Sequence, residues 1–570
     1  MNANTNTHVN AELAGLLAKY AEADAGLTAT GSPFEVRPEH VGGEAMLVYA
    51  NRPRSLGEVL AAATKHGDRD CFIFDDGTRL SFAEVVRDTR RVAAGLADRG
   101  IGRGDRVAIC APNRLEWLLT FWAATSMGAV VVAMNGWWTG TEMTNALELT
   151  EPKLLIGDQK RIERLPADIR MTTPTIDMDE DFASLYAAPT TAEMPAIDED
   201  EPAMLLFTSG TTGRPKAAAL SHRNVVAFVM SQDFIAARGM ALAGRTAAGP
   251  PATRLAVFPL FHVSGMSATV ACMLSGATTV WPLGRFDPGR VIELTKQHGI
   301  RAWGGTVTHI LRLLDHPDIA TVDPQTLAQV GIGGSATTPE VIRRTEAAFP
   351  HLTGTFSTGY GSTESGGLIS YASNAMIRLV PECVGPILPT IEVRIVDDDG
   401  NDVSDGEEGN ICCRSPLVMM EYWRNPQANA EVFLDGRWLK TGDFGRLEGG
   451  ALFLASRRRD LILRGGENVY PFEIENRLDE HPDIEEAAVI GIDHDILGQE
   501  IAAIVVVREG STLTLEAVRG WCAETLATYK VPVHIEIRTT PLPRNPTGKV
   551  MKHLLADPST ETSASLFVDE

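Results

Sequence analysis

The stretch Leu205–Asn224, LLFTSGTTGRPKAAALSHRN, decides how the rest of the chain is interpreted. A short apolar run that predicts a strand leads into a loop of glycines and hydroxyl residues. Glycine has no side chain, so the backbone N–H groups of Gly210 and Gly213 can approach an anion closely. Lys216 adds a full positive charge. Hydroxyl donors are supplied by Thr208, Ser209, Thr211 and Thr212. The stretch predicts a phosphate-binding loop, although a P-loop would place its lysine directly after glycine and directly before Ser or Thr.

Composition sets the class of protein. The chain has 570 residues, of which 44% are hydrophobic and 22% are charged, which is typical of a globular protein with at least two domains. A formal net charge of −23 argues against nucleic-acid binding and against binding to an anionic membrane surface, since both need basic patches. The seven cysteines form no CxxC pair and no zinc-type spacing, and no signal peptide is evident, so we expect a cytoplasmic protein.

The first 380 residues alternate between strand and helix patterns. Ser81 and Glu84 form a capping box that predicts a helix ending near Gly100. The uncharged run 117–141 is long enough to cross a bilayer, but Gly128 interrupts it, which favours a buried helix followed by a buried strand. The alternation predicts parallel sheets covered by helices.

From about residue 383 the pattern changes to short antiparallel strands, with Gly449-Gly450 as a hairpin turn. A compact α/β unit follows residues 456–460. It is predicted to contain helices near 471–481 and 514–527 and strands near 487–492, 501–507 and 533–538. We therefore predict an α/β protein with a large N-terminal domain, a small antiparallel subdomain and a small mobile C-terminal domain. The expected boundaries are an N-terminal extension at 1–48, the large domain at 49–458 and the C-terminal domain at 459–570.

Six further motifs occur in a fixed order along the chain. They are FPLFHVSG (258–265), GGSATTPE (333–340), TGYGSTES (358–365), KTGDFG (440–445), RRRDLILRGGENVYPFEIE (457–475) and PRNPTGKV (543–550). Together with TSGTTGRPK, this set resembles the adenylate-forming superfamily of acyl-CoA synthetases, peptide-synthetase adenylation domains and firefly luciferase. The resemblance covers roughly residues 50 to 555.

The resemblance implies a role for each matching residue. Tyr360 would stack on adenine, Asp443 and Arg457 would hold the ribose, and Lys549 would sit between the carboxylate and the α-phosphate. Thr208 and Glu364 would hold Mg²⁺, a hard cation that takes oxygen ligands. Gly465 and Gly466 would line the pantetheine tunnel, with Arg459 as the hinge. The implied catalytic group is Thr208, Lys216, His262, Glu364 and Lys549. The other implied nucleotide contacts are Ser209, Gly210, Thr211, Thr212, Gly334, Ser335, Thr358, Gly359 and Thr363.

The implied acyl pocket is mostly apolar or small. Its members are His262, Val263, Met266, Thr308, His309, Ala336 and Gly361. The sequence TVTH (306–309) departs from the family pattern VPTM, so the pocket wall is expected to be unusual. No Arg or Lys lies in the pocket motifs to pair a second carboxylate, so we expect a hydrophobic acid.

The resemblance implies two steps. A carboxylate attacks the α-phosphate of MgATP to give an acyl-adenylate and pyrophosphate, and the thiol of CoA then takes the acyl group and releases AMP. A medium- or long-chain fatty acid is favoured. Three alternatives stay open: a CoA ligase for a bulky aryl, alicyclic or steroid side-chain acid, an enzyme that loads a carrier protein, and a luciferase-like oxygenase. No nucleic-acid partner or transmembrane segment is expected, and a homodimer stays open.

Overall fold

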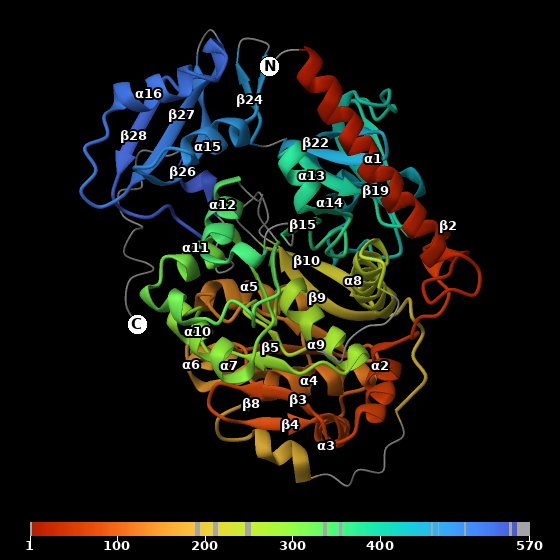
Figure 1. Cartoon of the computed structure of the whole chain (residues 1–570). Coiled ribbons are helices and arrows are strands. Elements are labelled where there is room, and N and C mark those ends of the chain that lie inside the picture. The colour runs from red at the N-terminus through yellow and green to blue at the C-terminus, as the bar shows by residue number, and fades with distance from the viewer. Residues whose placement is uncertain are drawn as a thin grey trace.

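The computed structural model describes residues 3–187, 194–208, 215–245, 252–333, 339–352, 356–457, 460–464, 467–494, 497–545 and 550–555. A large body carries the chain as far as β23 (Ala451–Arg457), and a smaller unit begins at β24 (Ile462–Arg464). The small unit lies over α11 (Val307–Leu314) and α12 (Pro339–Ala348) in Figure 1. The α/β fold with a large N-terminal and a small C-terminal domain is confirmed. The exact domain boundaries remain predictions.

A seven-stranded sheet forms the centre of the large body. Its order is β20 (Glu421–Tyr422), β10 (Lys216–Ser221), β9 (Pro202–Thr208), β6 (Val130–Ala133), β5 (Arg106–Cys110), β7 (Leu154–Gly157) and β8 (Thr175–Asp177). The strands from β9 to β8 are parallel, whereas β9 and β10 form an antiparallel pair. The sequence did not indicate this pair, and it places the two ends of the phosphate loop side by side.

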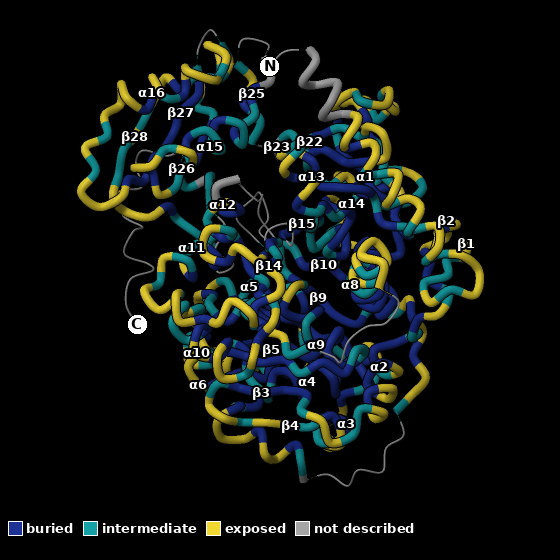
Figure 2. The backbone as a smooth tube through the Cα atoms, viewed as in Figure 1, coloured by how far each residue is buried: buried dark blue, intermediate teal, exposed yellow. Residues whose placement is uncertain are grey.

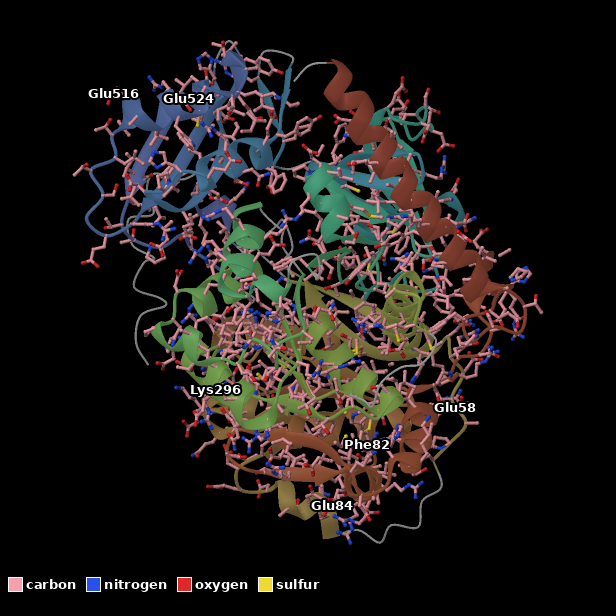
Figure 3. All side chains as sticks on the ribbon, in the orientation of Figure 1. Glu58, Phe82, Glu84, Lys296, Glu516 and Glu524 are labelled. Atoms are coloured by element: carbon pink, nitrogen blue, oxygen red, sulfur yellow. The ribbon has the colours of Figure 1, made fainter. Side chains whose placement is uncertain are left out.

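Helices cover this sheet as the sequence predicted. The helix α3 (Phe82–Asp98) begins with the expected capping box, in which Ser81 and Glu84 bond each other's backbone. Figure 3 labels Phe82 and Glu84 in its first turn. The run 117–141 folds as the buried helix α4 (Leu115–Ser126) followed by the buried strand β6. The other helices of the body up to the phosphate hairpin are α2 (Leu56–Ala62), α5 (Gly140–Thr150), α6 (Gln159–Ile162) and α7 (Ala167–Thr172).

Helix α8 (His222–Leu242) follows β10 directly. It is the described helix that is long and apolar enough to cross a membrane, but its first half is buried in the domain core. The buried strands beside it are visible in Figure 2. We interpret α8 as a core helix.

Two four-stranded sheets flank the centre. One contains β11 (Arg254–Leu255), β12 (Thr279–Trp281), β3 (Asp70–Phe74) and β4 (Arg79–Ser81). The other contains β13 (Ala302–Gly305), β14 (Gln329–Ile332), β15 (Ser357–Tyr360) and β16 (Ser370–Ser373). Their helices are α9 (Val263–Ser275), α10 (Pro288–His298), α11, α12 and α13 (Asn374–Leu379).

The predicted antiparallel subdomain is a six-stranded sheet. It contains β17 (Cys383–Pro386), β23, β22 (Trp438–Glu448), β19 (Glu408–Arg414) and β18 (Glu392–Val396), with β21 (Phe433–Leu434) beside β22 and α14 (Pro426–Val432) before it. Gly449 and Gly450 both have positive φ and join β22 to β23, which confirms the expected hairpin.

The C-terminal unit is a five-stranded sheet with two helices. It contains β25 (Glu467–Val469), β24, β27 (Gly498–Val507), β26 (Ile484–His494) and β28 (His534–Arg538), with α15 (Pro471–Asp479) and α16 (Leu515–Ala523). Strands β26 and β27 form one long hairpin, which extends beyond the two short strands expected. Helix α16 ends four residues earlier than the expected 514–527, because α-helical backbone gives way after Glu524.

The N-terminal residues pack onto the large body. Helix α1 (Ala3–Thr28) crosses α8, and the hairpin of β1 (Val36–Val41) and β2 (Glu44–Tyr49) follows it. The fully buried Arg238 guanidinium of α8 ion-pairs with Asp24 at 3.3 Å and lies 4.8 Å from the Tyr20 ring centre. These contacts fix α1 in place.

Candidate active site

The β9–β10 pair forms the base of the phosphate loop. Thr208 ends β9 and Lys216 begins β10, and the two residues are direct cross-strand partners. The chain therefore returns to its starting point after the loop, with a hydroxyl and an ammonium group at the two ends. The predicted contacts Ser209, Gly210, Thr211 and Thr212 lie outside the described residues.

Tyr422 connects the predicted phosphate and magnesium residues, and sequence reasoning missed it. Its hydroxyl donates to Glu364 Oε1 at 2.8 Å, and the Lys216 Nζ lies 5.0 Å from its ring centre. Burial and the neighbouring Glu364 carboxylate raise the pKa of Tyr422, while a hydrogen bond with Thr208 acts in the opposite direction. One neutral phenol thus contacts three residues predicted to act on the triphosphate.

The predicted nucleoside residues also lie together. Tyr360 ends β15, and its hydroxyl donates to Asp443 Oδ2 at 2.8 Å. Burial, followed by the Asp443 charge, raises the pKa of Tyr360. Asp443 in β22 lies directly opposite Arg457 in β23. The residues expected to contact adenine and ribose therefore form one row across β15, β22 and β23.

Backbone packing explains the glycines of TGYGSTES. A Cβ atom at Gly361 would lie 2.6 Å from both the Gly367 carbonyl oxygen and the Leu368 nitrogen. A Cβ atom at Gly359 would lie 2.8 Å from the Leu368 Cδ1. Because the neighbours of Gly361 are backbone atoms that cannot move aside, this turn needs glycine. Thr358 lies in β15, and Thr363 lies in the turn that follows, next to Glu364.

The segment 258–265 is held by Asn113, a second residue that sequence reasoning missed. Its side chain donates to the Phe258 carbonyl at 3.1 Å and accepts from the Leu260 N–H at 2.8 Å. The segment leads to His262, the N-cap residue of α9. Burial of the imidazole lowers the pKa of His262 to about 4, although part of the residue stays accessible to solvent. Val263 and the fully buried Met266 follow on α9. His262 is therefore neutral near pH 7.

Helix α11 presents the other predicted pocket residues. His309 stacks on Phe286 with ring centres 4.3 Å apart and also meets Phe258 at 6.0 Å. Its Nδ1 accepts the Thr306 N–H at 3.3 Å as part of a capping box. Burial, Arg312 and Arg544 lower the pKa of His309 to about 4. The departure from the family pattern at His309 thus builds the start of α11, and its place in the acyl pocket stays a prediction.

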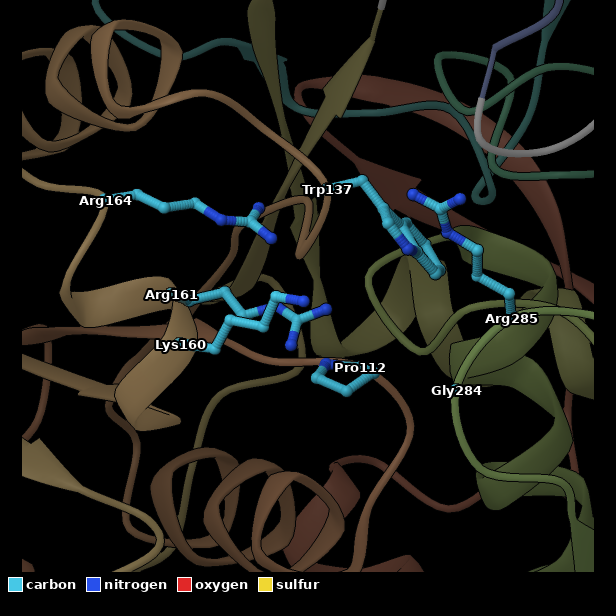
Figure 4. A pocket seen from close by; sticks show the side chains of 7 residues that line it. All are labelled: Pro112, Trp137, Lys160, Arg161, Arg164, Gly284 and Arg285. Atoms are coloured by element: carbon cyan, nitrogen blue, oxygen red, sulfur yellow. The ribbon is translucent and has the colours of Figure 1, made fainter. Parts of the chain in front are cut away.

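A cationic cavity lies beside the segment 258–265, called the gate segment from here on. It has a volume of about 220 Å³ and is lined by Pro112, Trp137, Lys160, Arg161, Arg164, Gly284 and Arg285 (Figure 4). Trp137 packs edge-on against Phe261, with ring centres 5.1 Å apart, next to His262. Burial and the nearby Arg161 lower the pKa of Arg164, so these cations lie close enough to repel one another. An anionic ligand would relieve that repulsion.

Several predicted residues lie outside the described part of the chain. They are Lys549, Gly334, Ser335, Ala336, Arg459, Gly465 and Gly466, and for Arg457 only the backbone is described. Gly333 is described at the end of β14, where its N–H donates to Gly305. Arg544 and Val550, on either side of Lys549, form an isolated antiparallel bridge. The roles expected for the residues outside the described part of the chain remain predictions.

The donor set fits a magnesium ion held mainly by substrate. Within the described residues, no group of three His, Cys, Asp or Glu side chains could hold a metal by itself. Glu364 offers a carboxylate held by Tyr422, and Thr208 offers a hydroxyl close by. Mg²⁺ commonly takes one or two protein oxygens and completes its shell with phosphates and water. The arrangement suits MgATP.

Some of the residues that sequence reasoning missed carried a usable sequence signal, and others carried none. Lys160, Arg161 and Arg164 recur at helical spacing within QKRIERLP, and that spacing was a usable signal. Tyr422 and Arg285 carried no signal, because the chain brings them to the site from distant elements.

The site and the fold together define an adenylate-forming enzyme. Residues 59–423 match the family model described as AMP-binding enzyme, and residues 473–549 match the AMP-binding enzyme C-terminal domain. The chain belongs to the AMP-binding enzyme family.

Comparison with similar proteins narrows the class of enzyme within this family. The chain is 29% identical to the medium-chain acyl-CoA ligase ACSF2 of Danio rerio, over 87% of each protein. It is 30% identical to the 3-[(3aS,4S,7aS)-7a-methyl-1,5-dioxo-octahydro-1H-inden-4-yl]propanoyl:CoA ligase of Rhodococcus jostii, over 89% of this chain and 99% of the relative. The o-succinylbenzoate CoA synthetase of Bacillus subtilis, solved with ATP and magnesium, has a TM-score of 0.74 at 28% identity, over 88% of this chain and 99% of the other. The protein is an AMP-forming acid–thiol ligase of the acyl-CoA synthetase type.

Proposed function

We propose that this ligase activates a hydrophobic carboxylic acid with MgATP and transfers the acyl group to CoA. The observation that carries the proposal is the cationic cavity beside the gate segment. Four cationic side chains converge there in a protein whose formal net charge is −23. Such a concentration of positive charge fits a thiol substrate that itself carries several phosphates.

The cavity favours CoA over a carrier protein. CoA bears a 3′-phosphate and a diphosphate next to its adenine, and guanidinium groups bind phosphate oxygens in pairs. Trp137 supplies an aromatic wall on which adenine can stack. Trp137 also contacts Phe261, so a pantetheine arm starting here would reach the gate beside His262. Arg161 already pairs with Asp158 at 3.0 Å, and a carrier protein, which would present one phosphate at the surface, would engage fewer of the other three cations than CoA would.

The acid is proposed to be hydrophobic. Met266 is buried, His262 and His309 are neutral, and Phe258 and Phe286 flank His309. None of these side chains is a cation. Of the two arginines that act on His309, Arg544 is paired with Glu486 and Arg312 lies 5.5 Å from the Phe286 ring centre. A medium- or long-chain fatty acid is the first choice. A bulky alicyclic or aryl acid is the second, and the two CoA ligase relatives above are named for acids of these two kinds.

The proposed chemistry uses the residues in two steps. In the first, a carboxylate oxygen attacks the α-phosphorus, the bond to the bridging oxygen breaks, and pyrophosphate leaves. Lys216 and the glycine loop would hold the leaving phosphates. Lys549 would offset the repulsion between the carboxylate and the α-phosphate as they approach each other. Mg²⁺ would offset phosphate charge beside Glu364 and Thr208. Asp443 and Arg457 would orient the ribose while Tyr360 lies against adenine.

In the second step the CoA sulfur attacks the acyl carbon, the bond to the AMP oxygen breaks, and AMP leaves with that oxygen. Rotation about Arg459 would exchange Lys549 for Gly465 and Gly466 at the site. We further propose a cytoplasmic location, since all seven cysteines are free thiols and buried. A homodimer stays a prediction for light scattering to test.

A substrate screen tests the proposal. Pyrophosphate release is measured with acetate, octanoate, palmitate, aryl acids and bicyclic alkanoates, and CoA thioesters are identified by mass. The expected result is the highest kcat/KM with a hydrophobic acid and a thioester product with free CoA. Acetate or an amino acid as the best substrate, or acyl transfer only to a carrier protein, would overturn it.

A further inference from the structure

One arginine joins the C-terminal unit to the large domain next to the predicted catalytic lysine. Arg544 Nη1 donates to Thr308 Oγ1 on α11 at 2.7 Å. Its Nη2 forms an ion pair with Glu486 on β26 of its own unit. Arg544 also bridges to Val550, and the Met551 N–H donates to the Pro543 carbonyl at 2.8 Å. The position of Arg544 therefore fixes both ends of the stretch that includes Lys549.

We propose that Arg544 is a positioning residue that latches the C-terminal unit onto helix α11 for acyl-adenylate formation and releases it for thioester formation. The inference rests on the proposed two-step function. The inference adds a positioning residue and a docking face to that function. The latch is the contact between Arg544 and Thr308, and the docking face is the first turn of α11.

The distribution of charge makes this contact reversible. The Thr308 hydroxyl on the large domain is neutral, whereas the charged Glu486 belongs to the unit that moves. When the unit rotates, Arg544 keeps its ion pair, and water can replace the Thr308 hydroxyl. An ion pair between the two domains would instead leave an unpaired charge after each rotation, which is costly where solvent access is restricted.

The place of the contact also limits its strength. Thr308 lies in the first turn of α11, at the positive end of the helix dipole, which repels a guanidinium. The Arg544 side chain keeps 26% of its surface exposed, so water reaches it. A charge-assisted hydrogen bond of this kind can favour one orientation of the C-terminal unit on α11 without making that orientation permanent.

The test separates the two half-reactions in the full-length protein. Thr308→Val removes the hydroxyl and leaves the Arg544–Glu486 pair intact, and Arg544→Gln removes the charge. Single-turnover pyrophosphate release with octanoate measures the first step. Conversion of supplied octanoyl-adenylate to octanoyl-CoA measures the second. Each variant is expected to slow the first step by roughly ten-fold or more, the scale of one hydrogen bond to a charged group. Arg544→Gln, which lies outside the predicted acyl pocket, is expected to leave the second step at or above its original rate.

Arg538→Gln is the matched control. Arg538 has the same 26% side-chain exposure and pairs with Glu536 on its own strand, without contact to the large domain in the described structure. Both half-reactions should keep their rates in this variant. The double variant Thr308→Val with Arg544→Gln should be no slower in the first step than Arg544→Gln alone, because both changes remove the same contact. Equal losses in both half-reactions, no loss in either, or fully multiplicative effects would overturn the latch.

Cross-linking tests the contact without relying on activity. In a Thr308→Cys, Arg544→Cys variant, a short bis-methanethiosulfonate reagent should join the two positions in the absence of substrates, since all native cysteines are buried. Each cysteine thiolate displaces methanesulfinate and forms a disulfide, which a reductant later cleaves. The joined protein should fail to convert octanoyl-adenylate until the linker is cleaved. Failure to cross-link would overturn the latch. A wild-type protein that activates no acid would contradict the proposed function while the cross-link still reports on the latch.

Discussion

Tyr422→Phe removes one hydroxyl group from the centre of the predicted triphosphate site. In the wild type this hydroxyl donates to the Glu364 carboxylate at 2.8 Å, and the ring lies under the Lys216 ammonium. The substitution keeps the ring and therefore the cation–π contact. It removes a hydrogen bond to a charged acceptor, which contributes about 1.5–3 kcal/mol. Because Glu364 is half-buried and water can replace part of that bond, we expect an effect near the lower limit, about ten-fold in rate.

The assay compares single-turnover pyrophosphate release with conversion of supplied acyl-adenylate over a series of Mg²⁺ concentrations. We expect slower release, a higher Mg²⁺ requirement for half-maximal rate, and an unchanged second step. Tyr186→Phe serves as the control, because Tyr186 is a half-buried tyrosine in the 3-10 turn Phe182–Ala187, away from these residues. An unchanged Mg²⁺ requirement in Tyr422→Phe would refute the view that Tyr422 positions Glu364. Equal losses in both steps would point to a general structural role.

Three further outcomes are expected. Lys549→Ala should slow acyl-adenylate formation by on the order of 10²–10³, the scale for one electrostatic donor, and spare thioester formation from supplied acyl-adenylate; equal losses would contradict the assigned role. Arg164→Gln combined with Arg285→Gln should raise the KM for CoA by roughly ten-fold or more without changing acid-dependent pyrophosphate release, and an unchanged KM would remove CoA from this cavity. Burial lowers the pKa of His222 to about 4 in the folded protein, so on acidification His222 is protonated in the unfolded chain at a higher pH than in the folded protein. The free energy of unfolding should therefore be insensitive to this residue above about pH 7, fall by up to about 1.4 kcal/mol per pH unit between about pH 6.5 and 4, and level off below. Urea titrations should show a flatter pH dependence for His222→Gln, and the same slope would contradict the assignment.

Local signals predicted the local structure well. The capping box at Ser81 and Glu84, the break at Gly128 and the hairpin at Gly449-Gly450 each depend on residues a few positions apart. Their geometry is set by backbone preferences that sequence neighbours determine. The family and its reaction followed from motifs of the same kind, since each motif is a short turn around a ligand.

Contacts between distant elements were not predictable in this way. Tyr422 reaches Lys216 because β20 pairs with β10 at the edge of the central sheet, and the sequence contains no signal for that pairing. Arg285 meets Arg164 because a loop after β12 closes over the helix that follows β7. The partner of Arg544 depends on how two folded units dock, which no single segment determines. Helix α16 was overestimated: it ends at Ala523, with Glu524 as its C-cap.

The contrast between global and local charge has a functional consequence. ATP and CoA are polyanions, and a protein of net charge −23 repels them at long range. Ionic screening confines that repulsion to about 8 Å at physiological salt, so affinity depends on cations within the sites themselves. Lys216 and the cationic cavity supply these at two separate places, one beside the β9–β10 hairpin and one beside the gate. Pyrophosphate and AMP that leave such sites enter a negative field, which opposes rebinding. Local cations on an acidic protein therefore confine anion binding to these two places, so ATP and CoA need not compete for one positive surface.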